Sequence, residues 1–208
     1  MIDWLLLSKG LGVGVLVAAP VGPVGALCIR RAISIGRTAA IGTGLGAATA
    51  DAFYGGVAAF GLTAISDFLL DYQMHATFLG GFFLLYLSYR IMSSLRRGTV
   101  AAEAGNAFAL GPAFVSTFFI TLTNPATILS FAAIFAGIGF IGDVEAFDSA
   151  IVLVSGVFFG SAAWWVFLAF ISHELKKRFG SRFEYLVNIG SAVLIGFFGV
   201  AALTSLLF

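Results

Sequence analysis

A single carboxylate stands deep inside a long apolar stretch of this chain. Between Thr38 and Ser66 the only charged residue is Asp51. If this stretch crosses a bilayer, an ionised side chain at its centre costs about 2.5–3.5 kcal/mol on insertion scales, so such a residue usually has a function. We expect Asp51 to bind a substrate ammonium group or a coupling proton, and to release one when the other arrives. The structural alternative is an aspartate held by nearby hydroxyls, such as those of Thr49 or Thr123.

Prolines provide the second candidate feature. Pro20-Val21-Gly22-Pro23 lies within one apolar stretch and Asn124-Pro125 within another. Proline lacks an N–H and clashes with the carbonyl one turn earlier, so it interrupts a helix and frees polar backbone groups. Within lipid such groups are tolerated only where they face protein or a watery cavity. The alternative is that these prolines merely bend helices so that the helices pack.

The groups around these interruptions could hold a carboxylate or an amino group. Asn124 can donate and accept hydrogen bonds, and a helix that begins at Pro125 would favour an anion at its N-terminus. The N–H groups around Gly22 and Gly25 could bind a carboxylate in the same way. The candidate residues for substrate or proton binding are Asp51, Asn124, Pro20, Gly22, Pro23, Gly25, Pro125 and Tyr54.

Composition places these residues in a membrane protein. Of the 208 residues, 60% are apolar and 10% are charged, and the mean hydropathy is +1.05. A typical soluble domain carries about 25% charged residues. The net charge of +1 argues against a nucleic-acid-binding surface. The single cysteine, Cys28, excludes an intrachain disulfide and a cysteine-based metal cluster.

The apolar stretches predict an all-α polytopic membrane protein. A helix needs about 20 residues to cross a bilayer, and we place six spans at roughly 6–28, 39–65, 74–95, 112–141, 149–171 and 186–207. Ten of the eleven basic residues lie in the loops after the first, third and fifth spans or, for Arg90, near the loop end of the third span. By the positive-inside rule these loops are cytoplasmic, so both termini lie outside the cytoplasm. We expect Arg30, Arg31 and Arg37 to set this topology and to contact lipid head groups.

Three spans in each half imply that the two halves enter the membrane from opposite sides. Any similarity between them is then an inverted repeat, which is common in secondary transporters. The second span of each half carries Gly42-x-x-x-Gly46 or Gly156-x-x-x-Gly160, although helix packing alone explains such motifs. We expect one membrane domain over 1–208, built from three-helix repeats at 1–98 and 106–208, with Pro-broken helices 1 and 4.

Three motifs together carry a family resemblance. The first is Ala19-Pro20-Val21-Gly22-Pro23-Val24-Gly25-Ala26, followed by Arg30-Arg31. The second is Ala50-Asp51-Ala52, and the third is Leu122-Thr123-Asn124-Pro125-Ala126. Along most of the chain they resemble the LysE/RhtB family of amino-acid exporters. Family members often carry a polar pair after the opening Gly-Pro, whereas this chain has Val24 and Gly25.

The resemblance implies export of amino acids or their derivatives across the cytoplasmic (inner) membrane of a bacterium, in exchange for protons and without a cofactor. The motif around Asp51 resembles the branch for basic amino acids, and the stretch after Asn124-Pro125 resembles the branch for neutral ones. The substrate therefore stays open. The glycines on the spans could also join two copies of the chain, which leaves a homodimer open.

Two other classes of function fit less well. A metal-cation exporter of a related superfamily branch is the alternative, but it needs clustered Asp, His, Cys or Met within the spans, and Asp51 stands almost alone. An intramembrane enzyme needs a nucleophile with its base, or metal ligands. The chain has no H-E-x-x-H and no G-x-S-x-G, so we expect neither catalytic nor metal-binding residues.

Overall fold

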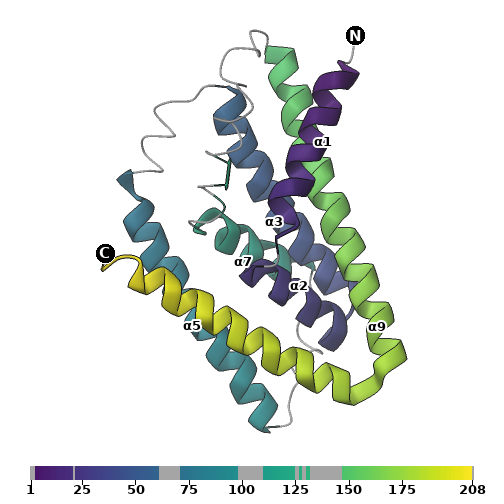
Figure 1. Cartoon of the computed structure of the whole chain (residues 1–208), viewed down its shortest axis with the longest axis vertical. Helices are drawn as coiled ribbons and strands as arrows, with labels where there is room; N and C mark the ends of the chain where they lie inside the picture. Colours follow the sequence, from purple (N-terminus) through teal and green to yellow (C-terminus); the bar gives the residue numbers. More distant parts are fainter. Residues whose placement is uncertain are drawn as a thin grey trace.

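The computed structural model describes residues 3–20, 22–60, 71–97, 110–124, 127, 130–131 and 147–207. In these residues the chain forms six α-helices, which confirms the predicted all-α class for this part of the chain. The helices are α1 (Trp4–Ala18), α2 (Pro23–Ser34), α3 (Arg37–Ala59), α5 (Gln73–Arg97), α7 (Leu110–Leu122) and α9 (Phe147–Thr204). Figure 1 shows α1 beside one arm of α9 and α5 beside the other, with α2, α3 and α7 in the middle of the molecule.

The long helix α9 consists of two arms that meet at Gly180. This residue has φ +69°, a conformation that favours glycine, and it breaks the helix into a first arm (147–179) and a second arm (181–204). The first arm contains the predicted span 149–171, and the second arm covers the predicted span 186–207 as far as Thr204. The basic segment between those spans lies at the corner that Figure 1 shows between green and yellow. The helix therefore holds two of the expected spans.

The first predicted span, 6–28, divides into two helices. α1 begins at Asp3, whose Oδ1 accepts hydrogen bonds from the N–H groups of Leu5 and Leu6, and it ends at Ala18. α2 begins at Pro23, a position where the fixed φ of proline suits a helix and its missing N–H is not needed. The axes of the two helices differ by 83°. The polypeptide therefore turns sharply in the middle of the molecule.

Among the described residues, length and composition identify two helices that can cross a membrane, α5 and α9, with the α1–α2 pair as a third if its bend lies within one span. α3 has enough residues but is rich in glycine, alanine and threonine. It lies at the centre, where neighbouring helices bury most of its length, so it needs fewer large apolar side chains than a lipid-facing helix. Of the predicted span 112–141, α7 covers the beginning, and most of the remainder lies outside the described residues.

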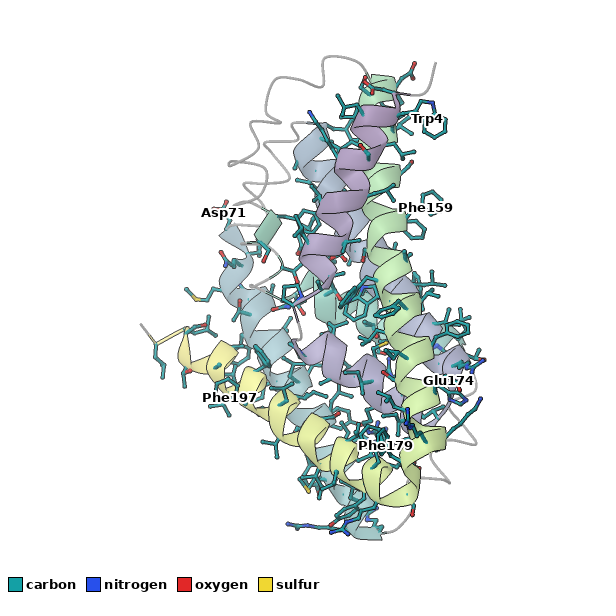
Figure 2. All side chains as sticks on the ribbon, turned by 45° about the vertical axis from the view of Figure 1, so that its right-hand side comes forward. Trp4, Asp71, Phe159, Glu174, Phe179 and Phe197 are labelled. Carbon is teal, nitrogen blue, oxygen red and sulfur yellow. The ribbon has the colours of Figure 1, made fainter. Side chains whose placement is uncertain are left out.

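The outer surface carries large apolar side chains. Figure 2 shows Trp4, Phe159 and Phe197 pointing away from the helices that carry them, and these side chains are 71%, 59% and 64% exposed. Soluble monomers rarely show apolar surface on this scale. A lipid environment accounts for it.

Glycines bring two pairs of helices into backbone contact. A Cβ added to Gly14 on α1 would collide with the Val157 carbonyl oxygen, and one added to Gly160 with the Leu11 carbonyl oxygen. On α3, a Cβ added to Gly46 would collide with the Phe114 carbonyl oxygen of α7. Contacts advance in the same direction along both members of each pair, so α1 runs parallel to the first arm of α9, and α3 runs parallel to α7.

Candidate functional site

A small cavity lies near the ends of three helices. α1 ends at Ala18, α2 begins at Pro23 and α7 ends at Leu122, and between them is a space of about 60 Å³. Its lining comes from five helices and the segments that adjoin them: Val17, Ala18, Pro20, Gly22, Pro23, Val24, Gly25, Asp51, Thr121, Asn124, Thr127 and Trp165. We call this space the central cavity.

Six of the eight candidate residues line the central cavity. They are Pro20, Gly22, Pro23, Gly25, Asp51 and Asn124. Pro125 lies outside the described residues. Tyr54 is not among the lining residues. Its hydroxyl instead donates to the Leu122 carbonyl oxygen at the end of α7, and its ring packs on Phe131. Tyr54 therefore holds the end of a helix that lines the cavity.

The Asp51 carboxylate is 2% exposed and is positioned by the first arm of α9. Its Oδ2 accepts a hydrogen bond from the Ser161 hydroxyl at 2.6 Å, and the Ser161 Oγ accepts one from the Trp165 Nε1 at 3.1 Å. Thr49 and Thr123, the hydroxyl partners considered from the sequence, instead donate to carbonyl oxygens one turn earlier in their own helices. The partner is therefore Ser161, 110 residues away along the chain.

Backbone donors face the cavity from the beginning of α2. Gly22 is the N-cap residue and provides no capping side chain, and Pro23 occupies the first helical position. The first N–H groups of a helix have no partner within it, and the helix dipole gives this end a partial positive charge. At Val24 and Gly25, which line the cavity, this end can therefore bind an anionic group.

Polar groups at the end of α7 and just after it also line the central cavity. The Asn124 side chain donates from Nδ2 to the Thr127 Oγ1 at 3.1 Å, and its backbone N–H donates to the Thr121 carbonyl oxygen at 3.2 Å. Thr121 is 4% exposed, and its Oγ1 has no hydrogen-bond partner among the residues that the structure describes. A buried hydroxyl without a partner is unfavourable, so a ligand or water in the cavity would satisfy it.

Sequence reasoning missed several of these side chains. Thr121 and Thr127 are hydroxyls near a helix end, and no pattern separates them from other threonines in the same stretch. Trp165 is an aromatic residue within an apolar stretch, which predicts packing, and it both packs in the core and lines the cavity. Ser161 directly follows Gly160 of the Gly156-x-x-x-Gly160 motif, but this position does not by itself identify it as the partner of Asp51.

The expectation that the first basic cluster contacts lipid head groups is wrong for Arg30. Its side chain is buried, and Nε donates to the Asn188 Oδ1 at 2.9 Å. Arg31 donates to the hydroxyls of Thr43, Ser116 and Thr117, at 2.7, 2.9 and 3.0 Å, and thereby joins α2 to α3 and α7. Arg37 is more exposed and pairs with Glu174. The acceptors for Arg30 and Arg31 come from distant helices, which the sequence alone could not place beside them.

A second and larger space, of about 310 Å³, adjoins the central cavity. Pro23 and Asn124 line both spaces. The other lining residues belong to α5, α7, the second arm of α9 and the residues after α7 and α9: Thr77, Gly80, Gly81, Leu84, Ile120, Thr123, Phe198, Ala201, Ala202 and Ser205. We call it the lateral cavity.

The donor set suits an organic ion better than a metal ion. In the described part of the chain there is no group of three or more His, Cys, Asp or Glu side chains that could hold a metal. The central cavity offers one carboxylate, a helix N-terminus, an amide and hydroxyls. Opposite charges on one small molecule could be accommodated there.

Comparison with known proteins agrees with the resemblance noted from the motifs. A family model described as LysE type translocator matches residues 15–206. The putative amino acid efflux protein YcgF of Bacillus subtilis (strain 168) is 31% identical over 199 residues, which are 94% of this chain and 88% of that protein. The uncharacterized membrane protein YahN of Escherichia coli (strain K12) is 27% identical over 178 residues, which are 84% of this chain and 77% of that protein. No solved structure matches.

Proposed function

Because the chain belongs to the LysE type translocator family, a family of membrane transporters, we propose that it exports amino acids or their derivatives across the cytoplasmic membrane in exchange for protons. The observation that carries this proposal is the central cavity, where a carboxylate and the N-terminus of a helix line the same small space. This pairing is what an amino acid requires, because its ammonium and carboxylate groups are attached to one carbon atom.

In this proposal the two charges of the substrate bind at different walls. The carboxylate binds the N–H groups at the beginning of α2, near Gly22 and Gly25, with hydroxyl support from Thr121. The ammonium group binds Asp51. Ser161 donates to Oδ2 of this carboxylate, which orients it and leaves the other oxygen to contact the substrate.

The same carboxylate provides the exchange with protons. A protonated Asp51 is neutral and attracts an ammonium group weakly, whereas an ionised Asp51 binds it. Substrate and proton therefore compete for one site, and the protein carries one in each direction. This is the minimal requirement for antiport, and it needs no second ionisable residue in the cavity.

The two halves of the chain supply the conformational change as an inverted repeat. In such a repeat, α1 of the first half corresponds to α7 of the second, and α3 corresponds to the first arm of α9. The pair of α1 with the first arm of α9 therefore corresponds to the pair of α7 with α3, and each pair is parallel and in contact through glycines. At the contact of α5 with the second arm of α9, a Cβ added to Gly81 would meet Leu203, and a Cβ added to Gly199 would meet Leu85. These contacts support repeats related by a two-fold axis, and rocking of such repeats alternately exposes a central site.

The proposal is tested by exchange in proteoliposomes under an imposed pH gradient. Vesicles are loaded in turn with lysine, arginine, threonine, homoserine, leucine and cysteine. We expect the gradient to accelerate exchange of at least one of them, and Asp51→Asn to abolish that acceleration. Asp71→Asn, the same change at an exposed carboxylate, is the matched control and retains it. Unchanged rate and pH dependence in Asp51→Asn would remove the carboxylate from the mechanism.

A further inference from the structure

We propose that the lateral cavity binds the side chain of the transported molecule, and that the substrate is an amino acid with an uncharged, largely apolar side chain. This inference rests on the proposed function and goes beyond it, because the motifs leave basic and neutral substrates equally open. It follows from the position, the lining and the size of the lateral cavity.

The position makes the two cavities one binding site. Pro23 and Asn124 line both, so a molecule that occupies one cavity reaches the other past these two residues. The central cavity, about 60 Å³, contains the charged and hydrogen-bonding groups, and the lateral cavity is about 310 Å³. The smaller space suits the charged groups of an amino acid, and the larger one suits a side chain of variable size.

The lining of the lateral cavity selects against a charged side chain. Its described lining residues are apolar or small, apart from Asn124 and the hydroxyls of Thr77, Thr123 and Ser205, and none of them is charged. Leu84, Ile120 and Phe198 provide aliphatic and aromatic surface. The ammonium of a lysine side chain would lose its water there without gaining a carboxylate, which is strongly unfavourable. A leucine or phenylalanine side chain would leave water for apolar surface, which is favourable.

The lateral cavity could instead be occupied by a lipid acyl chain. The substrate is favoured because Pro23 and Asn124, the residues that join the two spaces, are also walls of the charged site. A lipid occupant would be independent of the substrate, so changing the size of the cavity would affect all transported amino acids alike. The two occupants therefore predict different results for the ratio of two substrates.

Substrate competition tests the inference on the wild-type protein. Exchange of labelled alanine is measured in proteoliposomes with unlabelled leucine, phenylalanine or lysine as competitors. We expect leucine to compete at concentrations about tenfold or more below those of lysine, since burying the lysine ammonium without a charged partner is strongly unfavourable. Lysine competing as well as leucine, or exchange of lysine without leucine, overturns this inference while amino-acid export stands. Absence of exchange for every amino acid overturns the export proposal as well.

Filling the cavity tests which residues form it. Ala202→Leu reduces the space for a side chain, so we expect the leucine-to-alanine ratio of exchange rates to fall about tenfold. Val200→Leu, on the same helix at a position 52% exposed, is the matched control and leaves the ratio unchanged. The ratio is taken within one preparation, so a lower yield of folded protein cancels. Thr77→Ala enlarges the cavity, so we expect it to raise the leucine-to-alanine ratio. This variant provides an independent test if Ala202→Leu does not fold. Ratios that stay constant in the folded variants overturn the inference.

Discussion

At the scale of single residues, the central cavity depends on a few polar groups and the hydrogen bonds that join them. Asp51, Ser161 and Trp165 form a chain of hydrogen bonds between α3 and the first arm of α9. Within a low-dielectric interior such a chain fixes the position of its last member, here the carboxylate, more firmly than one contact would. The proposed mechanism requires that fixed position, because the same oxygen atoms must receive a proton and an ammonium group in turn.

Removing the Ser161 hydroxyl tests this positioning. Ser161→Ala leaves Asp51 without its α9 donor, so we expect the substrate KM for exchange to rise about tenfold or more, which corresponds to one hydrogen bond to a charged group. Ser161→Thr keeps the hydroxyl and restores the KM. Ser172→Ala changes another buried serine of the same helix and serves as the control. A merely structural serine would lower the amount of folded protein and leave the KM unchanged.

Arg31 provides a second prediction at this scale. Its NH1 and NH2 atoms donate to hydroxyls on α3 and α7, and a lysine cannot reproduce this planar set of donors. We expect Arg31→Lys to lower the melting temperature of the purified protein by roughly 5 °C or more. Arg37→Lys, at the more exposed arginine, should change it little. Equal melting temperatures for both variants would contradict the bridging role of Arg31.

The sequence predicted the charged and backbone parts of the site but not their hydrogen-bond partners. Asp51 stands out because a carboxylate in an apolar stretch is costly, and the region of Pro20 and Pro23 stands out because proline interrupts helices. These signals are local. Ser161 and Thr121 acquire their meaning only when α9 and α7 pack beside α3, so no local pattern identifies them. The same applies to Arg30, whose partner Asn188 is 158 residues away.

At the scale of helices, close approach through glycine sets the positions of the cavity walls. α1 and the first arm of α9 touch along Gly10, Gly14, Gly156 and Gly160. This contact sets the position of Ala18, where α1 ends, relative to Trp165 of α9 in the cavity wall. The motif Gly156-x-x-x-Gly160 was visible in the sequence, but its partner helix was not, because such motifs specify close packing without specifying a neighbour.

A matched pair of glycines on α1 tests this contact. A methyl group at Gly14 would collide with the Val157 carbonyl oxygen, whereas the position of a methyl group at Gly12 is open. We expect Gly14→Ala to lower the melting temperature by several degrees, and Gly12→Ala to leave it unchanged or raise it slightly because alanine favours helix. Equal effects at both positions would show that α1 does not rest on α9 through its glycines.

At the scale of the whole molecule, the distribution of charge predicts the orientation in the membrane. Lys176, Lys177, Arg178 and Arg182 surround the corner at Gly180 between the two arms of α9. Positive loops are retained in the cytoplasm, so we predict that this corner lies inside and that the C-terminal end of the second arm lies outside. The acidic residues between the other predicted spans support the same prediction.

Labelling of single cysteines checks the orientation. Cys28 is fully buried, so it contributes little background to a membrane-impermeant maleimide. We expect Leu207→Cys to react in intact cells and Arg178→Cys to react only after the cells are opened. The reverse labelling pattern would show that the protein has the opposite orientation in the membrane.

The central claim, that substrate and proton compete for Asp51, is tested most directly by proton release on binding. Purified protein is kept in weakly buffered detergent solution at a pH at which Asp51 is protonated. It is mixed with the amino acid identified by the exchange assay, and a pH indicator reports the protons released. We expect the wild type to release about one proton for each amino-acid molecule that it binds. We expect Asp51→Asn to release none, even when the amino-acid concentration is high enough for the variant to bind it. Binding without proton release in the wild type, or equal release in the variant, would contradict it.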